Sequence, residues 1–173
     1  MNILIVGNLS SGKTSIANKL KEKRNTFEYV SIDDLRREKS DGTYAGEFFA
    51  WSYLLNAVQH PSDDGTIIEF SGTGKNSWFV RESIRYSMEK YNAKWIVVYC
   101  LCEESILIER NKNRKNDVPF PYKFENIISG IKFISSELSK RYSSNYWLSP
   151  EMTIRTDQNT VEECADLILK KLG

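Results

Sequence analysis

Residues 2–14 read NILIVGNLSSGKT, a short apolar run followed by a glycine-rich segment that contains a lysine and a threonine. Residues 2–6 predict a buried strand, because the run is short, rich in branched apolar residues and ended by Gly7. The residues from Gly12 to about Lys23 predict a helix. A strand, a glycine-rich turn and a helix in this order predict a loop that binds phosphate groups.

The residue types within this loop each have a physical role in binding phosphate. Gly7 lets the chain leave the strand in a tight turn, and Gly12 brings the backbone close to a ligand without an intervening side chain. Lys13 is expected to reach the β- and γ-phosphates, and the Thr14 hydroxyl is expected to contact Mg²⁺. The residues predicted to bind the nucleotide are Gly7, Asn8, Leu9, Ser10, Ser11, Gly12, Lys13, Thr14 and Ser15.

The rest of the chain alternates between strand-like and helix-like segments, which predicts an α/β fold with a parallel sheet covered by helices on both faces. At 173 residues we expect one domain. Thr160 is predicted to cap the last helix, with Glu163 completing a capping box. Further strands are predicted at 28–32, 66–70, 94–101 and 152–155, and further helices at 46–59, 77–91, 103–111 and 124–143.

Composition limits the classes of partner. Lys and Arg total 24 and Asp and Glu total 23, so the net charge is close to +1. This balance argues against wrapping nucleic acid or lying on a membrane, which both need a dominant basic field. No apolar run approaches the length of a membrane-spanning helix, and no targeting segment precedes the first predicted strand. Three cysteines fit a reducing compartment, so we expect a cytoplasmic protein with structural thiols.

A phosphate-binding loop does not by itself define an activity. A GTP-dependent switch normally carries Asp-x-x-Gly, but none of the nine glycines has an aspartate three residues before it. The segment 111–114, Asn-Lys-Asn-Arg, ends in arginine where guanine recognition needs aspartate. A motor ATPase usually needs a longer chain and a stronger acidic strand end than residues 67–69, Ile-Ile-Glu. Phosphoryl transfer to a small acceptor is the remaining interpretation.

Two residues after the second predicted strand are candidates for the acceptor side. Asp33 lies at the carboxyl edge of the sheet, where α/β proteins bind ligands. Arg36 follows three residues later and would lie beside it on a helix. The alternative is a solvated helix start with Asp33 or Asp34 as the cap; Asp34 is expected to cap the helix or face water, and Arg37 to lie on the surface.

Three more charged residues are candidates around the transferred group. Arg110 and Arg114 stand four apart and precede a polar loop of the kind that closes over phosphates, although a solvated basic face is the alternative. Glu69, at the end of the third predicted strand, is a candidate to hold a water on Mg²⁺. It is equally well explained as a simple acid at a strand end.

Two other patterns are ambiguous between structure and function. Tyr44, Phe48, Trp51 and Leu55 form a stripe at helical spacing, which predicts core packing, with contact to a base or sugar as the alternative. Residues 71–75, Ser-Gly-Thr-Gly-Lys, lack the spacing of a phosphate-binding loop. We interpret them as a loop leaving the third strand, whose amides border the site in the alternative interpretation.

Taken together, residues 7–14, 32–36 and 109–114 with Val118-Pro119 resemble the small P-loop kinases related to the kinase domain of bacteriophage polynucleotide kinase. Nucleoside monophosphate kinases, shikimate kinase and zeta-toxin-like kinases are more distant relatives. The resemblance implies a three-layer P-loop NTPase fold with a five-stranded parallel sheet of order 2-3-1-4-5. It implies ATP and Mg²⁺ as cofactors, a lid at about 110–121 and an acceptor-side segment at about 33–60.

The resemblance also implies individual roles. Asp33 would be the general base toward the acceptor hydroxyl, Arg36 would bind an acceptor-side phosphate, and Arg114, with Arg110 nearby, would contact the nucleotide phosphates. The predicted catalytic residues are Lys13, Asp33, Arg36, Arg110 and Arg114, and the predicted metal-binding residues are Thr14 and Glu69.

The sequence thus predicts a kinase that moves the γ-phosphoryl group of Mg-ATP to a hydroxyl or phosphate of a small acceptor, such as a nucleoside or nucleotide. A polynucleotide 5′-hydroxyl kinase is the alternative within the same class, since it needs only a local basic groove. A nucleotide-binding regulator without turnover is the alternative of another class.

Overall fold

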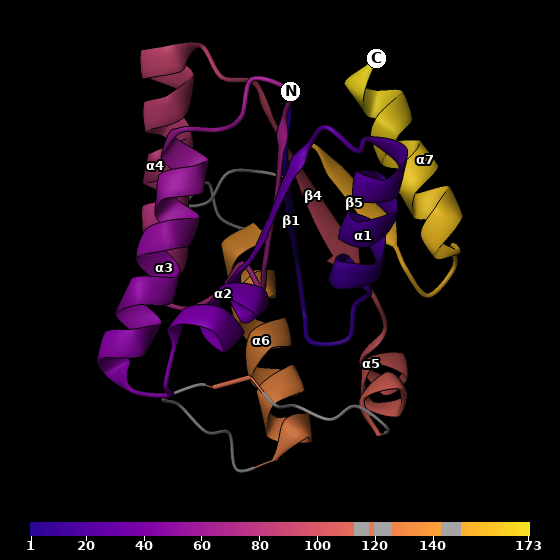
Figure 1. The fold of residues 1–173 in the computed structure, drawn as a ribbon. Coiled ribbons are helices and arrows are strands. Elements are labelled where there is room, and N and C mark those ends of the chain that lie inside the picture. The colour runs from indigo at the N-terminus through magenta and orange to yellow at the C-terminus, as the bar shows by residue number, and fades with distance from the viewer. Residues whose placement is uncertain (113–117, 120–125, 143–149) are drawn as a thin grey trace.

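The structure, a computed structural model, describes residues 1–112, 118–119, 126–142 and 150–173. Its centre is a five-stranded parallel sheet of order β2-β3-β1-β4-β5 (Figure 1). This confirms the predicted fold class and strand order. The strands are β1 (Asn2–Gly7), β2 (Glu28–Ser31), β3 (Thr66–Phe70), β4 (Trp95–Leu101) and β5 (Met152–Arg155).

Seven helices occur in the described part of the chain, and most begin and end close to the predicted positions. Helix α6 begins at Ile127, three residues after its predicted start, and α3 begins two residues early because the Thr43 hydroxyl accepts a hydrogen bond from the amide of Gly46 and caps the helix. The capping box of Thr160 and Glu163 is present as predicted. The helices are α1 (Lys13–Lys23), α2 (Ile32–Lys39), α3 (Tyr44–Gln59), α4 (Asn76–Tyr91), α5 (Glu104–Asn111), α6 (Ile127–Tyr142) and α7 (Val161–Leu172).

The two faces of the sheet support two separate hydrophobic clusters. Side chains of β1 alternate between them, so Leu4 and Val6 pack on one face and Ile3 and Ile5 on the other. Residues of α3 and α4 cover the first face, and residues of α1 and α7 cover the second. The central strands β1, β3 and β4 are buried on both sides, which explains why their sequences are nearly continuous apolar runs, whereas the edge strands β2 and β5 are partly exposed.

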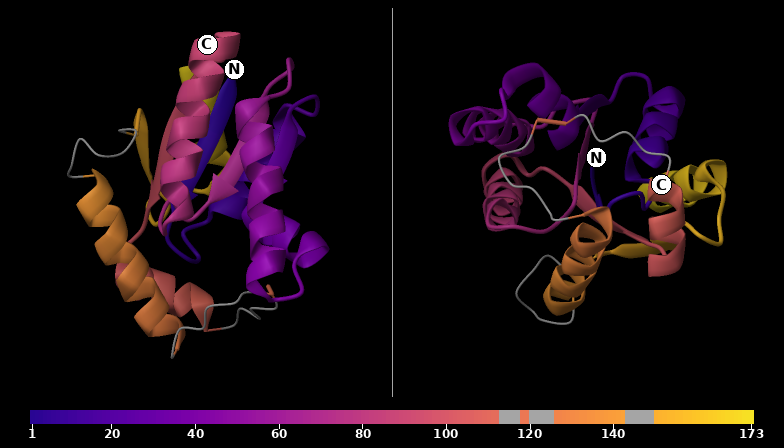
Figure 2. Two further views of the ribbon diagram at one scale, coloured as in Figure 1. Left: turned by 90° about the vertical axis from the view of Figure 1, so that its left-hand side faces the viewer. Right: turned by 90° about the horizontal axis from the view of Figure 1, so that it is seen from below.

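The carboxyl ends of the strands all lie at one edge of the sheet. Figure 1 and the left view of Figure 2 place both chain termini at the opposite end of the molecule, and place α5 and α6 toward the edge that carries the β1–α1 loop. Helices α5 and α6 pack against each other. Ligand sites in open parallel sheets form at this edge, so the fold brings the predicted site residues to one end.

The aromatic stripe on α3 is only partly in the core, which corrects the prediction. Trp51 is buried and Leu55 packs against the first cluster, but Tyr44 and Phe48 are 66% and 70% exposed. The first turns of α3 extend past the hydrophobic cluster, so the same helical face that is buried near Trp51 is exposed near Tyr44. Among the described residues, no helix is long and apolar enough to cross a membrane.

Candidate functional site

The β1–α1 loop, which the sequence predicts to bind phosphate, has a sharply turned backbone. Gly12 and Ser10 have positive φ values of 86° and 56°, which turn the loop tightly, and the amides of Leu9 and Ser11 donate hydrogen bonds to the side-chain and carbonyl oxygens of Asn8. A Cβ at Gly7 would lie 2.7 Å from both the Cys100 carbonyl oxygen and the Ser11 hydroxyl oxygen, so only glycine fits there. The loop opens directly into the N-terminus of α1, whose free amides and dipole favour an anion.

The side chains of the loop fix its shape. Lys13 is buried, and its Nζ donates a hydrogen bond to the Asn8 carbonyl oxygen at 2.8 Å, across the mouth of the loop. The Asn8 side-chain nitrogen, Nδ2, donates to the Ile131 carbonyl oxygen at 2.8 Å and to the Ser135 hydroxyl at 2.7 Å, which connects the loop to α6. Asn8 can therefore contact a phosphate through its backbone, while its side chain holds the loop in place.

Glu69 lies beside Thr14 and is held by two hydroxyl groups. The Thr14 hydroxyl donates to Glu69 Oε1 at 2.8 Å, and the Tyr29 hydroxyl donates to Glu69 Oε2 at 2.6 Å. Burial raises the pKa of the Tyr29 phenol, and the adjacent Glu69 charge raises it further, so Tyr29 remains a hydrogen-bond donor. The carboxylate is buried, and in the described part of the chain it forms no ion pair.

These residues fit a magnesium ion. Mg²⁺ prefers oxygen ligands and usually combines one or two carboxylates with water and substrate phosphates. Thr14 and Glu69 supply a hydroxyl and a buried anionic oxygen beside the phosphate-binding loop. No group of three or more His, Cys, Asp or Glu side chains suited to a metal occurs among the residues the structure describes. A metal here would therefore depend on the nucleotide for part of its coordination.

Asp33 and Arg36 are in contact, as their spacing predicts. Arg36 Nη1 donates to Asp33 Oδ1 at 3.0 Å. A residue that the sequence did not indicate, Glu47 of α3, accepts two more hydrogen bonds from the same guanidinium. Burial opposes the charge of Arg36, but the hydrogen bonds and charge of Glu47 outweigh that effect and raise the pKa of the guanidinium. Neither Asp33 nor Asp34 caps α2, whose N-cap is Ser31.

Arg110 connects the phosphate-binding loop to the loop after β5. Its Nη2 donates to the Thr156 carbonyl oxygen at 2.8 Å, and its Nη1 lies 3.5 Å from the Ser10 carbonyl oxygen. The side chain is exposed, and turning toward a ligand would replace its hydrogen bond to the carbonyl oxygen of buried Thr156. Arg114 and most of the predicted lid lie outside the described residues.

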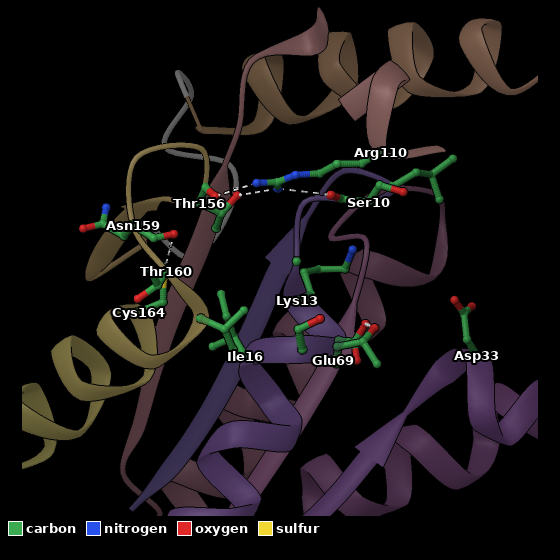
Figure 3. A pocket seen from close by; sticks show the side chains of 15 residues that line it. Ser10, Lys13, Ile16, Asp33, Glu69, Arg110, Thr156, Asn159, Thr160 and Cys164 are labelled. Atoms are coloured by element: carbon green, nitrogen blue, oxygen red, sulfur yellow. Dashed lines mark hydrogen bonds between the residues drawn. The ribbon is translucent and has the colours of Figure 1, made fainter. Parts of the chain in front are cut away.

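One cavity of about 550 Å³ joins these groups, a volume typical of small-ligand sites. Figure 3 shows Lys13 and Glu69 in its middle, Asp33 at one end, and Arg110, Thr156 and Asn159 toward the other. Arg36 does not line this cavity and reaches it only through Asp33. The predicted site residues that line it are Leu9, Ser10, Gly12, Lys13, Thr14, Ser15, Asp33, Glu69 and Arg110.

One end of the cavity is formed by the β5–α7 region, which the sequence did not indicate as part of the site. Thr156 follows the last residue of β5, so it lies at the same carboxyl edge of the sheet as Asp33. Applying the strand-end rule to the fifth strand would have found it. The other missed lining residues are Ile16, Asn159, Thr160, Val161 and Cys164.

The loop after β3 lies next to β1, but residues 71–75 are not among the residues that line the cavity, so the structure does not support the alternative in which its amides border the site. The Ser71 carbonyl oxygen accepts a hydrogen bond from the Gly7 amide at 3.3 Å. Arg141 of α6 donates to the Ser77 hydroxyl at 2.6 Å and to the Gly74 carbonyl oxygen at 3.3 Å. The loop is thus fixed between β1 and α6.

Comparison with known proteins gives a structural likeness without a sequence family. No protein-family model matches the chain, and no curated protein matches it in sequence. Among solved structures it is similar to shikimate kinase from Acinetobacter baumannii in complex with shikimate, with a TM-score of 0.69 and 20% identity over 99% of this chain and 92% of that one.

The chain is also similar to two further solved structures, a sugar kinase and a protein bound to phosphorylated GDP. A sugar kinase from Janibacter has a TM-score of 0.62 and 14% identity over 99% of this chain and 93% of that one. The YorR protein of Bacillus subtilis, solved in complex with phosphorylated GDP, has a TM-score of 0.58 and 16% identity over 99% of this chain and 95% of that one. At these identities the likeness shows that the chain shares the fold of these proteins, and it does not by itself assign an activity.

Proposed function

We propose that the protein is a Mg-ATP-dependent kinase that transfers the γ-phosphoryl group to a small acceptor. The main support for the proposal is that Lys13, Thr14 and the Asp33 carboxylate line the same cavity. Phosphoryl transfer needs the donor, the acceptor and neutralising charges to be positioned together more than it needs covalent help from the protein. The solved kinases of this fold support the same class of reaction.

The donor side would be formed by the phosphate-binding loop. Lys13 would exchange its hydrogen bond to the Asn8 carbonyl for contacts with the β- and γ-phosphates. Thr14 and Glu69 would hold Mg²⁺, which supplies neutralisation of charge on the phosphates when it is bound. Arg110 lies where it can turn toward the phosphates, and the resemblance gives Arg114 the same role.

The acceptor side would be organised by Asp33. Its carboxylate lines the cavity and is oriented by Arg36, so an acceptor hydroxyl can donate a hydrogen bond to it. In that position Asp33 orients the attacking oxygen and takes its proton as the new bond to phosphorus forms. Arg36 keeps the carboxylate in place throughout.

A polynucleotide 5′-hydroxyl kinase is the second candidate. The exposed rings of Tyr44 and Phe48, at the start of the helix that carries Glu47, favour it, because stacking on aromatic side chains is how proteins hold single strands. Salt separates the two candidates: polynucleotide affinity falls steeply with salt, and turnover of an uncharged small acceptor barely responds.

A screen with γ-labelled ATP tests the proposal. The acceptors are nucleosides, nucleotides, small polyols and 5′-hydroxyl oligonucleotides, and the controls are Lys13→Ala and Asp33→Asn. We expect label on at least one acceptor, less nucleotide binding in the first variant, and normal binding without transfer in the second. A protein that binds Mg-ATP but labels no acceptor, and whose cellular role is intact in Asp33→Asn, would instead be a nucleotide-dependent regulator.

A further inference from the structure

The arginine on the acceptor side is enclosed by carboxylates. Arg36 Nε donates to Glu47 Oε2 at 2.8 Å and Nη2 donates to Glu47 Oε1 at 2.5 Å, while Nη1 donates to Asp33. Only 13% of the Arg36 side chain and 9% of the Glu47 side chain are exposed. Glu47 therefore occupies the Nε–Nη2 edge of the guanidinium, and Asp33 engages Nη1 of the other edge, so both edges that could bind an anion in a bidentate manner already have carboxylate partners.

Glu47 is itself held in place by a buried residue of the same helix. Trp51, one turn along α3, donates from Nε1 to Glu47 Oε1 at 2.7 Å. The Arg36 guanidinium also lies 6.0 Å from the centre of the Trp51 ring. Both Glu47 oxygens thus accept hydrogen bonds, and the pair is held from α2 and from α3. This leaves Arg36 little freedom to turn toward a ligand.

The arrangement sets the sign of charge beside the acceptor. One guanidinium lies among two carboxylates, so the cluster of Asp33, Arg36 and Glu47 is net negative. A phosphate group next to Asp33, whose side chain is 32% exposed, would meet this negative charge at the protein surface, where repulsion is stronger than in bulk water. An uncharged hydroxyl can instead donate a hydrogen bond to Asp33 at no electrostatic cost.

We propose that Glu47 is a positioning and specificity-determining residue. It holds Arg36 against Asp33 and neutralises it, so that the acceptor side takes an uncharged, hydroxyl-bearing group and disfavours a phosphorylated one. This proposal rests on the proposed kinase function. It replaces a phosphate-binding role for Arg36 with an orienting role, and it favours a nucleoside or a polyol over a nucleotide whose phosphate adjoins the reactive hydroxyl.

The test is whether removing the Glu47 charge creates a phosphate site. The phosphate-binding loop is first filled with Mg²⁺ and a non-hydrolysable ATP analogue, and inorganic phosphate is then titrated by calorimetry. We expect Glu47→Gln to bind phosphate at least about tenfold more tightly than the unsubstituted protein. Adding Arg36→Gln to that variant should abolish the gain. Asp34→Asn, which removes an exposed carboxylate from α2, is the matched control and should show no gain.

The unsubstituted protein gives a second test that does not depend on the variant folding. With the nucleotide analogue bound, we expect no second phosphate site below about 10 mM, in the range of weak non-specific contacts. A tighter second site that Arg36→Gln removes would overturn the proposal, as would a folded Glu47→Gln variant without any gain, or an equal gain in Asp34→Asn. If the unsubstituted protein does not bind the Mg²⁺–nucleotide analogue at all, the proposed kinase function fails first, and this inference fails with it.

Discussion

Helix α2 carries two aspartate–arginine pairs with the same spacing, and their surroundings differ. In the first pair, Arg36 Nη1 lies 3.0 Å from Asp33 Oδ1, and in the second, Arg37 Nη1 lies 2.7 Å from Asp34 Oδ1. The Arg36 side chain is 13% exposed and is also bound by buried Glu47, whereas Arg37 is 41% exposed and Asp34 is 52% exposed.

The contrast shows that residue type, spacing and distance do not determine what an ion pair does. The exposed pair is screened by water and contributes little to stability. In the first pair Asp33 is 32% exposed, but the third partner and the low exposure of Arg36 fix the direction in which the Asp33 carboxylate points, and that carboxylate lines the cavity. Orientation of this kind is what a group that handles an acceptor hydroxyl needs.

The largest expected difference between the two aspartate–arginine pairs is in the turnover number, kcat. Asp33→Asn should lower kcat by about a hundredfold to ten-thousandfold, because an amide cannot take the acceptor proton. Asp34→Asn should leave kcat within about twofold, as expected for an exposed surface pair. Steady-state phosphoryl transfer on the acceptor found by the screen measures both, with calorimetry confirming that nucleotide affinity is unchanged. Equal losses in the two variants would remove the distinction between the pairs.

The next largest difference is expected in the free energy of unfolding when the arginine of each pair is replaced. Arg36→Gln leaves the buried Glu47 carboxylate without its cation, which should cost about 3–5 kcal/mol in the free energy of unfolding. Arg37→Gln should cost less than about 1 kcal/mol. Urea unfolding of the two variants gives both values from the midpoint and slope. Similar midpoints for both variants would mean that Glu47 does not depend on Arg36.

A smaller effect on the free energy of unfolding tests whether Trp51 holds Glu47 in place. Trp51→Phe removes the donor to Glu47 Oε1 and should cost about 1–2 kcal/mol, from the lost hydrogen bond and some lost packing. Trp78→Phe is the control on α4, since Trp78 is 45% exposed. Urea unfolding again provides the comparison. A stability for Trp51→Phe as high as that of the control would show that the indole does not support Glu47.

The smallest effect is the salt dependence of the exposed pair. A double-mutant cycle on Asp34 and Arg37 should give a coupling of about 0.2–1 kcal/mol at low salt. In about 1 M NaCl, where the screening length is about 3 Å, this coupling should fall toward zero. The same cycle on Asp33 and Arg36 should keep most of its coupling. If both couplings vanished together, the first pair would have to be regarded as a solvated one.

The sequence predicted much of this arrangement because the information is local. The strand, loop and helix of residues 2–23 are adjacent in the chain, and the apolar runs of the other strands identified the parallel sheet. The different surroundings of Asp33 and Asp34 also follow from position, since only the first lies directly at the carboxyl edge of β2. These predictions depend on short spacings and on one rule for where parallel sheets bind ligands.

What the sequence could not predict depends on contacts between elements. Glu47 looks like an ordinary first-turn acid of α3, and only the packing of α3 against α2 brings it to Arg36. Tyr29 reaches Glu69 across two neighbouring strands, 40 residues apart in the chain. Tyr44 and Phe48 have the helical spacing of core residues, but they lie beyond the edge of the cluster that covers Trp51.

The most direct measurement is calorimetric titration of Mg-ATP into the unsubstituted protein and into Lys13→Ala. We predict saturable, magnesium-dependent binding to the unsubstituted protein, because Lys13 and the Thr14–Glu69 pair line one cavity at the N-terminus of α1. Binding should be clearly weaker in the folded Lys13→Ala variant. No uptake by the folded, unsubstituted protein at millimolar Mg-ATP, or equal uptake by both proteins, would contradict a nucleotide site at this loop.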